Sequence, residues 1–174
     1  MSSQKGFQRL ENEIYKLKAK GYLKHATANY DKITLKLRGP EDTPYHNGIF
    51  LLNIELPQDY PFKSPSIGFI TKIFHPNVDE SSGSICLDVL NQVWSPLYVL
   101  TTVVETFIPQ LLSYPNPSDP LNIVAAKLYL EDRKAFNQRA KEYVERYCIQ
   151  IDTEREDPSY ELSDSDFEID SGMI

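Results

Sequence analysis

The chain has 174 residues, 41% of them apolar, and a formal net charge of −7. This length fits one ordinary domain with a small appendage. It has no apolar run near the roughly 20 residues of a membrane-spanning helix and no secretory signal pattern at its start. The two cysteines, Cys86 and Cys148, form no disulfide framework and no Cys-x-x-Cys pair, which is typical of a reducing compartment. We therefore expect a cytoplasmic or nuclear protein without membrane association.

The negative charge is concentrated at the C-terminal end. Residues 150–174 hold nine acids and one base, which gives −8, whereas residues 1–149 hold 17 bases and 16 acids, which gives +1. A segment with so much like charge and no apolar periodicity cannot offset the entropy lost on ordering. We predict a folded domain over 1–149 and a disordered acidic tail over 150–174. A nearly neutral domain with an acidic tail also argues against nucleic-acid binding.

The tail allows two interpretations. Ser163 and Ser165 are each followed by an acid three residues later, an arrangement suited to acid-directed kinases. A phosphate there would add negative charge and favour a basic partner. The alternative is that the tail only keeps the protein soluble.

The N-terminal segment is predicted to be an amphipathic helix. Its apolar residues recur at spacings of three and four: Phe7, Leu10, Ile14 and Leu17. Gly21 is a natural stop for this helix. The opposite side is basic and includes Lys5 and Arg9, and it is either a solvated face or a docking surface for an acidic partner.

Short apolar alternations then predict strands between Ala26 and Phe69. Three alternating residues, Ile33, Leu35 and Leu37, indicate a strand with one buried face, and further strands are expected over 49–56 and 66–70. Short connections favour an antiparallel meander, here of four strands. The Tyr60–Pro61 bond is a candidate for the cis form.

The stretch from His75 to Pro96 is rich in turn residues, so it is predicted to be a loop. Cys86 lies in its middle. A lone cysteine in a polar segment is a nucleophile candidate; the alternative is a small buried side chain between Ile85 and Leu87.

Helical periodicity returns after this loop. One mostly apolar helix is predicted from Leu97, Leu100, Val104, Phe107, Ile108 and Leu111, and Pro109 should kink or end it. A proline-rich loop follows over 114–121, where Asp119 could cap a short helix that starts at Pro120. An amphipathic helix is expected over 131–147, with Phe136, Tyr143 and Tyr147 on its apolar side. Strands followed by helices indicate an α+β domain.

Six motifs occur in one order at coherent spacing. They are Gly39-Pro-x-x-x-Pro-Tyr-x-x-Gly-x-Phe50, Tyr60-Pro-Phe-x-x-Pro65, His75-Pro-Asn77, Gly83-Ser-Ile-Cys-Leu-Asp88, Trp94-Ser-Pro96 and Pro115-Asn-Pro-x-Asp-Pro-Leu121. Together they resemble the ubiquitin-conjugating enzymes over residues 5–148. The run from Tyr114 and the acidic tail are most similar to the H-type subgroup. The resemblance implies an N-terminal helix, a four-stranded antiparallel meander, an active-site loop and C-terminal helices.

The resemblance also implies roles for individual residues. Cys86 would accept ubiquitin as a thioester, because a thiol is nucleophilic near neutral pH and its thioester stays reactive towards amines. Asn77 would support either the oxyanion during lysine attack or the loop around it, and Asp119 would orient the incoming lysine or simply cap a helix. His75 is expected to hold the turn rather than act as a base, and Asp88 would shape access to Cys86. The interval between Asn77 and Cys86 looks one residue longer than the common form.

Two partner surfaces follow from the same resemblance. Lys5 and Arg9 would meet the ubiquitin-activating enzyme, and Phe62 with Ser95 and Pro96 would bind RING-type ligases, with Phe62 as an exposed aromatic anchor. The remaining partners would be ubiquitin and substrate proteins, with histones as one class. No cofactor is expected in the chain itself, since ATP is consumed by the activating enzyme. We expect a monomer.

Three other readings are less well supported. A cysteine hydrolase would need a histidine oriented beside Cys86, and the sequence places none there. A non-catalytic binding module of the same fold is the main alternative, although the chain keeps Cys86, Asn77 and Asp119 together. Scattered histidines and distant cysteines give no metal-ligand spacing.

Overall fold

The computed structural model describes residues 2–150, apart from the side chains of residues 2–6, 87, 88 and 150. The predicted tail over 150–174 therefore lies outside the described residues, except for Gln150. The strands are β1 (Leu23–Ala26), β2 (Lys32–Arg38), β3 (Gly48–Glu55), β4 (Ser66–Phe69) and β5 (Ile149–Gln150). The helices are α1 (Ser2–Ala19), α2 (Leu87–Val93), α3 (Leu100–Thr102), η1 (Val103–Phe107), α4 (Ile108–Ser113), α5 (Ile123–Glu131) and α6 (Arg133–Tyr147).

The sheet is the predicted antiparallel meander, in the order β1-β2-β3-β4. The alternation of β2 determines which face is buried: Ile33, Leu35 and Leu37 lie in the core, at most 4% exposed. Their partners across β3 are likewise buried, because Leu35 pairs with Leu52 and Leu37 with Phe50. The Tyr60–Pro61 peptide bond is cis, as predicted.

A short fifth strand adds to the predicted four-stranded meander. β5 pairs with the start of β3, where Gly48 lies opposite Gln150 and Ile49 opposite Ile149. Since β2 occupies the other edge of β3, β5 continues the edge that β4 covers further along. Two residues at the end of a long helix give no alternation, so the sequence carries no visible signal for this strand.

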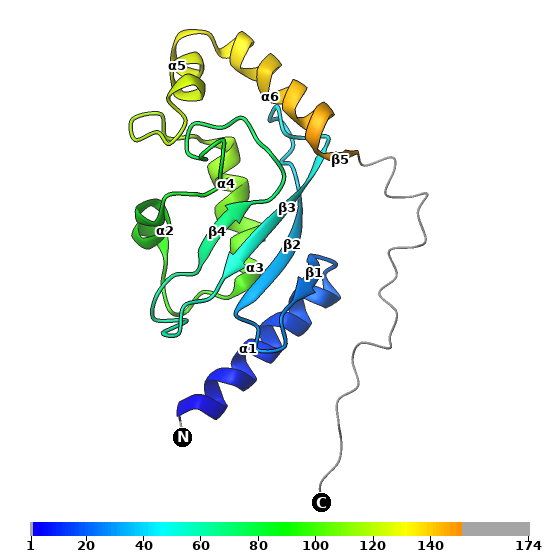
Figure 1. Cartoon of the computed structure of the whole chain (residues 1–174), viewed down its shortest axis with the longest axis vertical. Helices are drawn as coiled ribbons and strands as arrows, with labels where there is room; N and C mark the ends of the chain where they lie inside the picture. Colours follow the sequence, from blue (N-terminus) through cyan, green and yellow to red (C-terminus); the bar gives the residue numbers. More distant parts are fainter. Residues whose placement is uncertain (1, 151–174) are drawn as a thin grey trace, which may run out of the picture.

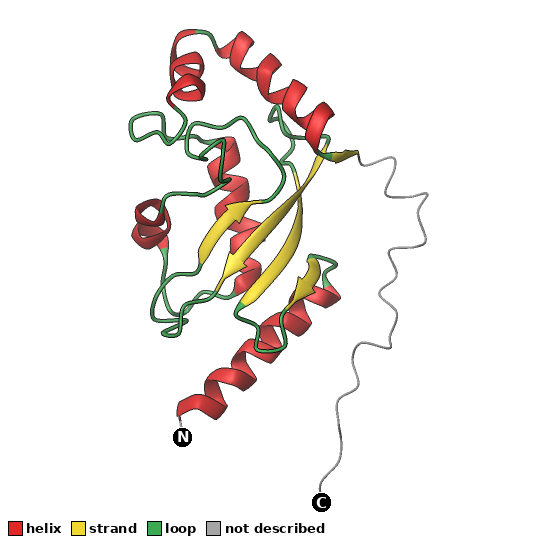
Figure 2. Cartoon of the chain, in the orientation of Figure 1, coloured by secondary structure: helices red, strands yellow, loops and turns green. Residues whose placement is uncertain are grey.

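Helices cover one face and both ends of the sheet. The helical stretch of α3, η1 and α4 passes behind the strands, while α1 lies at one end and α6 at the other (Figures 1 and 2). Ile14 and Leu17 of α1 are buried as expected, whereas Phe7 remains 47% exposed. Gly21 ends α1 in a left-handed conformation with φ +75°, and the Tyr22 N–H donates to the Leu17 carbonyl at 2.9 Å, the bonding of a Schellman cap.

Pro109 does not end its helix. It occupies the first turn of α4, and the preceding turn, η1, is a π-helix. Proline removes an N–H from the hydrogen-bonding ladder, and a π-turn re-routes the bonds around such an interruption. Leu97 is not part of this helix, contrary to the prediction: it is 88% exposed in the loop before α3.

The C-terminal helices have polar N-caps. The Asn122 side chain accepts from the Ala125 N–H at 3.0 Å at the start of α5, and Asp132 accepts from the Ala135 N–H at 2.9 Å at the start of α6. The predicted capping by Asp119 is therefore wrong, because the helix starts at Ile123 and not at Pro120. Within the described residues, no helix is both long and apolar enough to span a membrane.

Candidate active site

Cys86 lies at the junction between a tight hairpin and α2. It is the N-cap residue of α2, with φ −57° and ψ 127°, and its side chain is half-buried. The predicted loop over 75–96 thus contains a helix of seven residues. Leu90 of that helix is only 4% exposed and packs in the core. The helix was not predicted because turn residues dominate the average composition of the stretch.

A tight hairpin spans the interval between Asn77 and Cys86. Val78 and Ile85 form an antiparallel bridge, so Asn77, just before Val78, and Cys86, just after Ile85, are the next positions in register on the two arms of the hairpin. The turn is closed by Asp79, whose carboxylate accepts from the Ser82 N–H at 2.7 Å and from the hydroxyls of Ser81 and Ser82. These hydrogen bonds, that of Ser81 first, lower the pKa of Asp79 to about 2.

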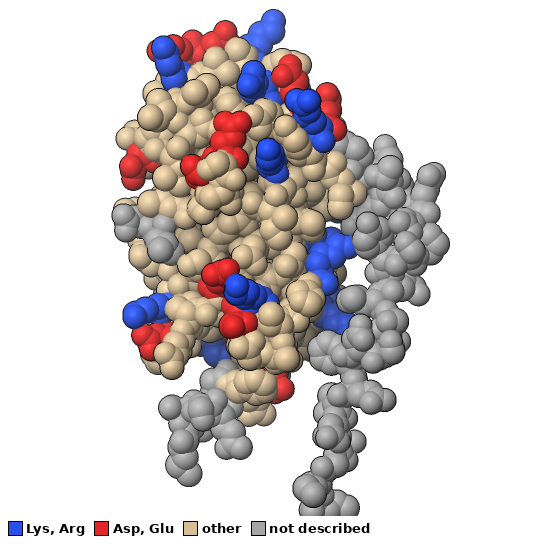
Figure 3. All heavy atoms as spheres, in the orientation of Figure 1, with Lys and Arg blue, Asp and Glu red and all other residues tan. Residues whose placement is uncertain are grey.

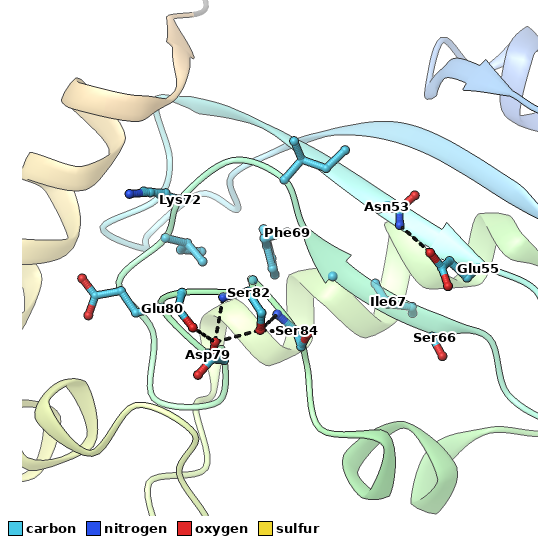
Figure 4. A pocket seen from close by; sticks show the side chains of 15 residues that line it. Asn53, Glu55, Ser66, Ile67, Phe69, Lys72, Asp79, Glu80, Ser82 and Ser84 are labelled. Atoms are coloured by element: carbon cyan, nitrogen blue, oxygen red, sulfur yellow. Dashed lines mark hydrogen bonds between the residues drawn. The ribbon is translucent and has the colours of Figure 1, made fainter.

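Gly83 makes the hairpin possible. Its φ is +73°, and a Cβ atom there would lie 1.9 Å from the Phe69 carbonyl oxygen. The Phe69 N–H donates to the Gly83 carbonyl at 2.7 Å, so the hairpin lies against β4. Figure 4 shows the polar cavity of about 470 Å³ that it forms with β3 and β4; Cys86 is not among its lining residues.

The turn His75-Pro76-Asn77 holds the site together. The buried His75 ring contacts the Leu111 carbonyl oxygen through Nε2 at 3.0 Å, while its Nδ1 accepts from the Asn77 N–H. Nε2 must therefore carry the proton of a neutral ring. Burial lowers the pKa of His75 to about 4, which matches its predicted role in holding the turn. The Pro76 carbonyl accepts from the N–H groups of Leu121 and Asn122.

The Asn77 side chain is fully buried and fully occupied. Its Nδ2 donates to the carbonyls of Asn116 at 2.6 Å and Asp119 at 3.3 Å. Its Oδ1 accepts from the Asn116 N–H at 2.8 Å. All the amide protons are thus engaged by the loop before α5, as the loop-supporting alternative requires.

Asp119 is exposed on that same loop. Its backbone carbonyl is held by Asn77, so the turn that faces Cys86 also sets the position of Asp119. Asp88 lies in the first turn of α2, but its side chain is outside the described residues.

A buried carboxylate joins α1 to two distant loops. Glu13 is 2% exposed; its Oε1 accepts from Arg9 Nε at 2.7 Å, and its Oε2 accepts from the Tyr60 hydroxyl at 2.7 Å and the Leu100 N–H at 2.9 Å. Arg9 also donates to the Tyr98 carbonyl at 2.7 Å. Arg9 is therefore part of this corner and not only a solvated base. The side chain of Lys5 is outside the described residues.

The corner carries an exposed apolar surface. Phe62 is 80% exposed and Leu97 is 88% exposed, while Pro96 is exposed and Ser95 half-buried. Trp94 Nε1 donates to the Pro61 carbonyl at 2.8 Å, which ties the two loops together. The structure thus brings Arg9, Phe62, Ser95 and Pro96 to one corner and adds Leu97, which the sequence analysis had assigned to a helix.

The second cysteine lies elsewhere, after α6 and beside Gly48. Burial raises the pKa of Cys148 to about 12, so its thiol stays protonated near neutral pH. In the described part of the chain no group of three histidine, cysteine or acidic side chains could hold a metal ion.

Comparison with known proteins defines the family. The model of the family described as "Ubiquitin-conjugating enzyme" matches residues 4–144. The chain belongs to the ubiquitin-conjugating enzymes. It is 48% identical to "Ubiquitin-conjugating enzyme E2 5" of Arabidopsis thaliana, over 94% of this chain and 89% of that protein. It is also 50% identical to "Ubiquitin-conjugating enzyme E2-24 kDa" of Saccharomyces cerevisiae, over 85% of this chain and 67% of that protein.

A solved structure agrees. A ubiquitin conjugating enzyme E2 domain of Toxoplasma gondii superposes with a TM-score of 0.74 at 34% identity, covering 82% of this chain and 98% of that one. The chain is therefore a ubiquitin-conjugating transferase with the fold predicted from its motifs. Members of this family in general work with ubiquitin, an activating enzyme and a ligase.

Proposed function

We propose that Cys86 carries ubiquitin as a thioester. The observation that supports this role most strongly is the position of its half-buried thiol, at the start of α2 and opposite the rigid His75-Pro76-Asn77 turn. In charging, the Cys86 sulfur attacks the thioester carbonyl carbon that joins ubiquitin to the activating enzyme, and the activating enzyme's thiol leaves. In transfer, a lysine amine attacks the new thioester, an amide bond forms, and the Cys86 sulfur leaves and recovers a proton.

We assign Asn77 to positioning. Its amide protons are already given to the Asn116 and Asp119 carbonyls, so donation to an oxyanion would require these bonds to break. Asp119 is the group we assign to orienting the lysine, because its carboxylate is exposed on the loop that Asn77 holds. Asp88, two residues after Cys86, is proposed to shape access to the thiol.

We assign the corner with Arg9, Phe62, Ser95, Pro96 and Leu97 to the activating enzyme and to a RING-type ligase. An exposed aromatic and an exposed leucine supply the apolar area that a contact needs. Because one corner would serve both partners, charging and transfer would alternate. Lys5 is assigned to the activating-enzyme side on the resemblance alone.

The remaining proposals rest on the sequence. We propose an H-type enzyme that acts in the cytoplasm or nucleus as a monomer, with histones among its substrates. ATP would be consumed by the activating enzyme and not bound by this chain. The proposed domain boundaries are those that the sequence indicates, a folded domain over 1–149 and an acidic tail over 150–174.

A charging assay tests the central proposal. The chain is incubated with activating enzyme, ATP and ubiquitin, and adducts are resolved without reductant beside Cys86→Ser and Cys148→Ser. We expect a thiol-sensitive adduct in the parent and in Cys148→Ser. In Cys86→Ser it should be lost or replaced by a reductant-resistant ester. A thiol-sensitive adduct that survives Cys86→Ser but not Cys148→Ser would overturn the assignment.

A further inference from the structure

Glu80 joins the hairpin before Cys86 to the two C-terminal helices. The neighbouring Asp79 closes the turn of this hairpin, whereas the Glu80 carboxylate points away from the hydrogen bonds that Asp79 makes (Figure 4). Its Oε1 accepts from the Tyr143 hydroxyl of α6. Its Oε2 accepts from Asn122 Nδ2, at the start of α5, at 3.4 Å. One carboxylate thus links the hairpin to α5 and α6.

Asn122 is the junction through which this link reaches the active-site turn. The residue is 5% exposed; its Oδ1 accepts from the Ala125 N–H in the first turn of α5, and its Nδ2 donates to Glu80. Its backbone N–H donates to the Pro76 carbonyl at 3.0 Å. Glu80 is therefore the acceptor that keeps the Nδ2 group of a buried asparagine hydrogen-bonded, and a buried donor without an acceptor is destabilising.

The loop that carries Asp119 is held at two points. Asn77 donates to the Asp119 carbonyl, and Asn122 follows three residues later, where the loop ends and α5 begins. Asn77 belongs to the buried turn, whereas Glu80 belongs to the hairpin whose second arm continues into Cys86. The hydrogen bond between Glu80 and Asn122 therefore fixes the end of this loop against the hairpin.

Tyr143 gives the exposed Glu80 side chain a fixed direction. The Tyr143 ring is half-buried and its centroid lies 5.5 Å from that of Phe74, in a small apolar core to which α5 and α6 both contribute. A solvated carboxylate loses rotamer entropy when it is ordered, and a hydroxyl on a packed ring supplies a donor that holds it in one orientation. The Glu80 carboxylate is thus directed at Asn122 before a lysine arrives.

We propose that Glu80 is a positioning residue for lysine transfer. Through Asn122 it fixes the end of the loop that carries Asp119, and so the placement of the Asp119 carboxylate relative to the Cys86 sulfur. It acts through Asn122 and not by contact with the reacting atoms. The inference rests on the proposed function, since it needs a thioester on Cys86 and a lysine oriented by Asp119. Misplacement of such a group by about 1 Å lowers a rate by up to about 10²-fold.

Single-turnover discharge of the full chain tests this role. Each variant is charged with ubiquitin, charging is stopped by removal of ATP, and free lysine is added while the loss of the thiol-sensitive adduct is followed. We expect Glu80→Ala to charge at the parental rate but to discharge roughly tenfold more slowly. Tyr143→Phe, which removes only the hydroxyl, should slow discharge in the same direction, by roughly threefold.

An exchange of hydrogen-bond roles separates positioning from a general loss of structure. Asn122→Asp keeps an oxygen for the Ala125 N–H but turns a second carboxylate towards Glu80, so discharge should again be roughly tenfold slower. Glu80→Gln alone sets one amide donor against another and should also be slowed. In the double variant the donor and the acceptor are exchanged, so the rate should return to within about threefold of the parent. Two independent structural defects would add up instead.

Glu142→Gln is the matched control for Glu80→Gln. Glu142 is also exposed and also accepts a side-chain hydrogen bond, from Gln138 Nε2 at 3.2 Å. Figure 3 shows acidic and basic side chains interspersed over the end of the molecule where α5 and α6 lie in Figure 1. The loss of one negative charge in such a mixed surface should leave discharge unchanged.

The outcomes distinguish this role from the proposed function. Normal charging with parental discharge in Glu80→Ala, no recovery in the double variant, or an equal loss in Glu142→Gln would overturn the positioning role alone. A parent chain that forms no thiol-sensitive adduct with ubiquitin would overturn the proposed function and the positioning role with it.

Discussion

The side chain of Asn77 pairs with both backbone polar groups of Asn116: Nδ2 donates to the Asn116 carbonyl at 2.6 Å, and Oδ1 accepts from the Asn116 N–H at 2.8 Å. The Asn77 amide thus bonds to Asn116 as a neighbouring strand would, although Asn116 lies in a loop 39 positions further along the chain. The loop that carries Asp119 depends on it for its position.

Asn77→Ala is expected to destabilise the fold. Removal of the buried amide deletes its three hydrogen bonds to the backbone of Asn116 and Asp119, which should lower the free energy of unfolding by about 2–4 kcal/mol. Urea unfolding gives this value, and hydrogen exchange should show faster exchange of the Asn116 amide. Asn53→Ala, at a half-buried asparagine on β3, is the control and should cost under about 1 kcal/mol. Parental stability together with slower lysine transfer would instead assign Asn77 directly to the reaction.

Phe62→Ala is expected to separate charging from ligase-stimulated transfer. Its ring is 80% exposed, so the change should alter stability by less than about 0.5 kcal/mol and leave thioester formation largely intact. Transfer stimulated by a RING-type ligase should fall roughly tenfold or more, the scale of a contact anchor. Leu97→Ala should act in the same direction.

Leu130→Ala provides the control for both changes, because Leu130 is 67% exposed on α5, away from the corner. It should change neither step. An equal loss of charging and ligase-stimulated transfer in Phe62→Ala would contradict a preferential role of Phe62 with the ligase.

Stability is expected to rise with pH over the range in which His75 titrates. Burial lowers the pKa of His75 from 6.5 to about 4, so between these values the unfolded chain binds more protons than the folded one. The contribution is fully present above about pH 6.5 and is lost as the pH falls towards 4. At most it amounts to about 3 kcal/mol.

Urea unfolding at a series of pH values between about 4.5 and 7.5 measures this dependence. His75→Gln should be less stable at pH 7, because the contacts to Leu111 and Asn77 change. Its free energy of unfolding should also vary less with pH, by up to about 1.4 kcal/mol per pH unit. Identical slopes in the two proteins would show that His75 does not titrate on unfolding.

The two thiols are expected to react at different rates. Burial raises the pKa of Cys148 to about 12, so only about one molecule in ten thousand carries its thiolate at pH 8. Iodoacetamide should therefore modify the half-buried Cys86 first, as peptide mass spectrometry would detect. Cys148→Ser should leave the rate at Cys86 unchanged, and urea should make Cys148 reactive in the parent. Fast modification of Cys148 in the folded chain would be the contrary result.

Local patterns predicted the parts of the fold whose signals are local. The alternation of Ile33, Leu35 and Leu37 located β2 and its buried face, and Gly21 marked the end of α1. The six motifs predicted one site with Cys86, Asn77 and Asp119, and the structure joins two of these residues, Asn77 and Asp119. Failures occurred where a short segment depends on tertiary contacts: α2 is hidden in a turn-rich stretch, and β5 has only two residues.

Two polar residues show what the sequence could not reveal. Asn122 comes directly before an apolar helical run and is a residue type typical of N-caps, but Pro120 indicated that the helix starts earlier. The sequence does not indicate that Glu13 is buried. It lies next to the apolar stripe of α1, where a charged side chain is usually solvated, and only the fold brings the Tyr60 hydroxyl and the Leu100 N–H to its carboxylate. Contacts between one carboxylate and residues far along the chain produce no periodic pattern, so they cannot be predicted from the sequence.

The burial of Glu13 has a consequence for partner affinity. One carboxylate fastens α1, the Tyr60 loop and the start of α3 to one another before any partner arrives. A rigid docking corner avoids most of the entropy loss that ordering loops and side chains costs on association. A substitution at Glu13, which is only 2% exposed, would therefore weaken the binding of partners that never touch it.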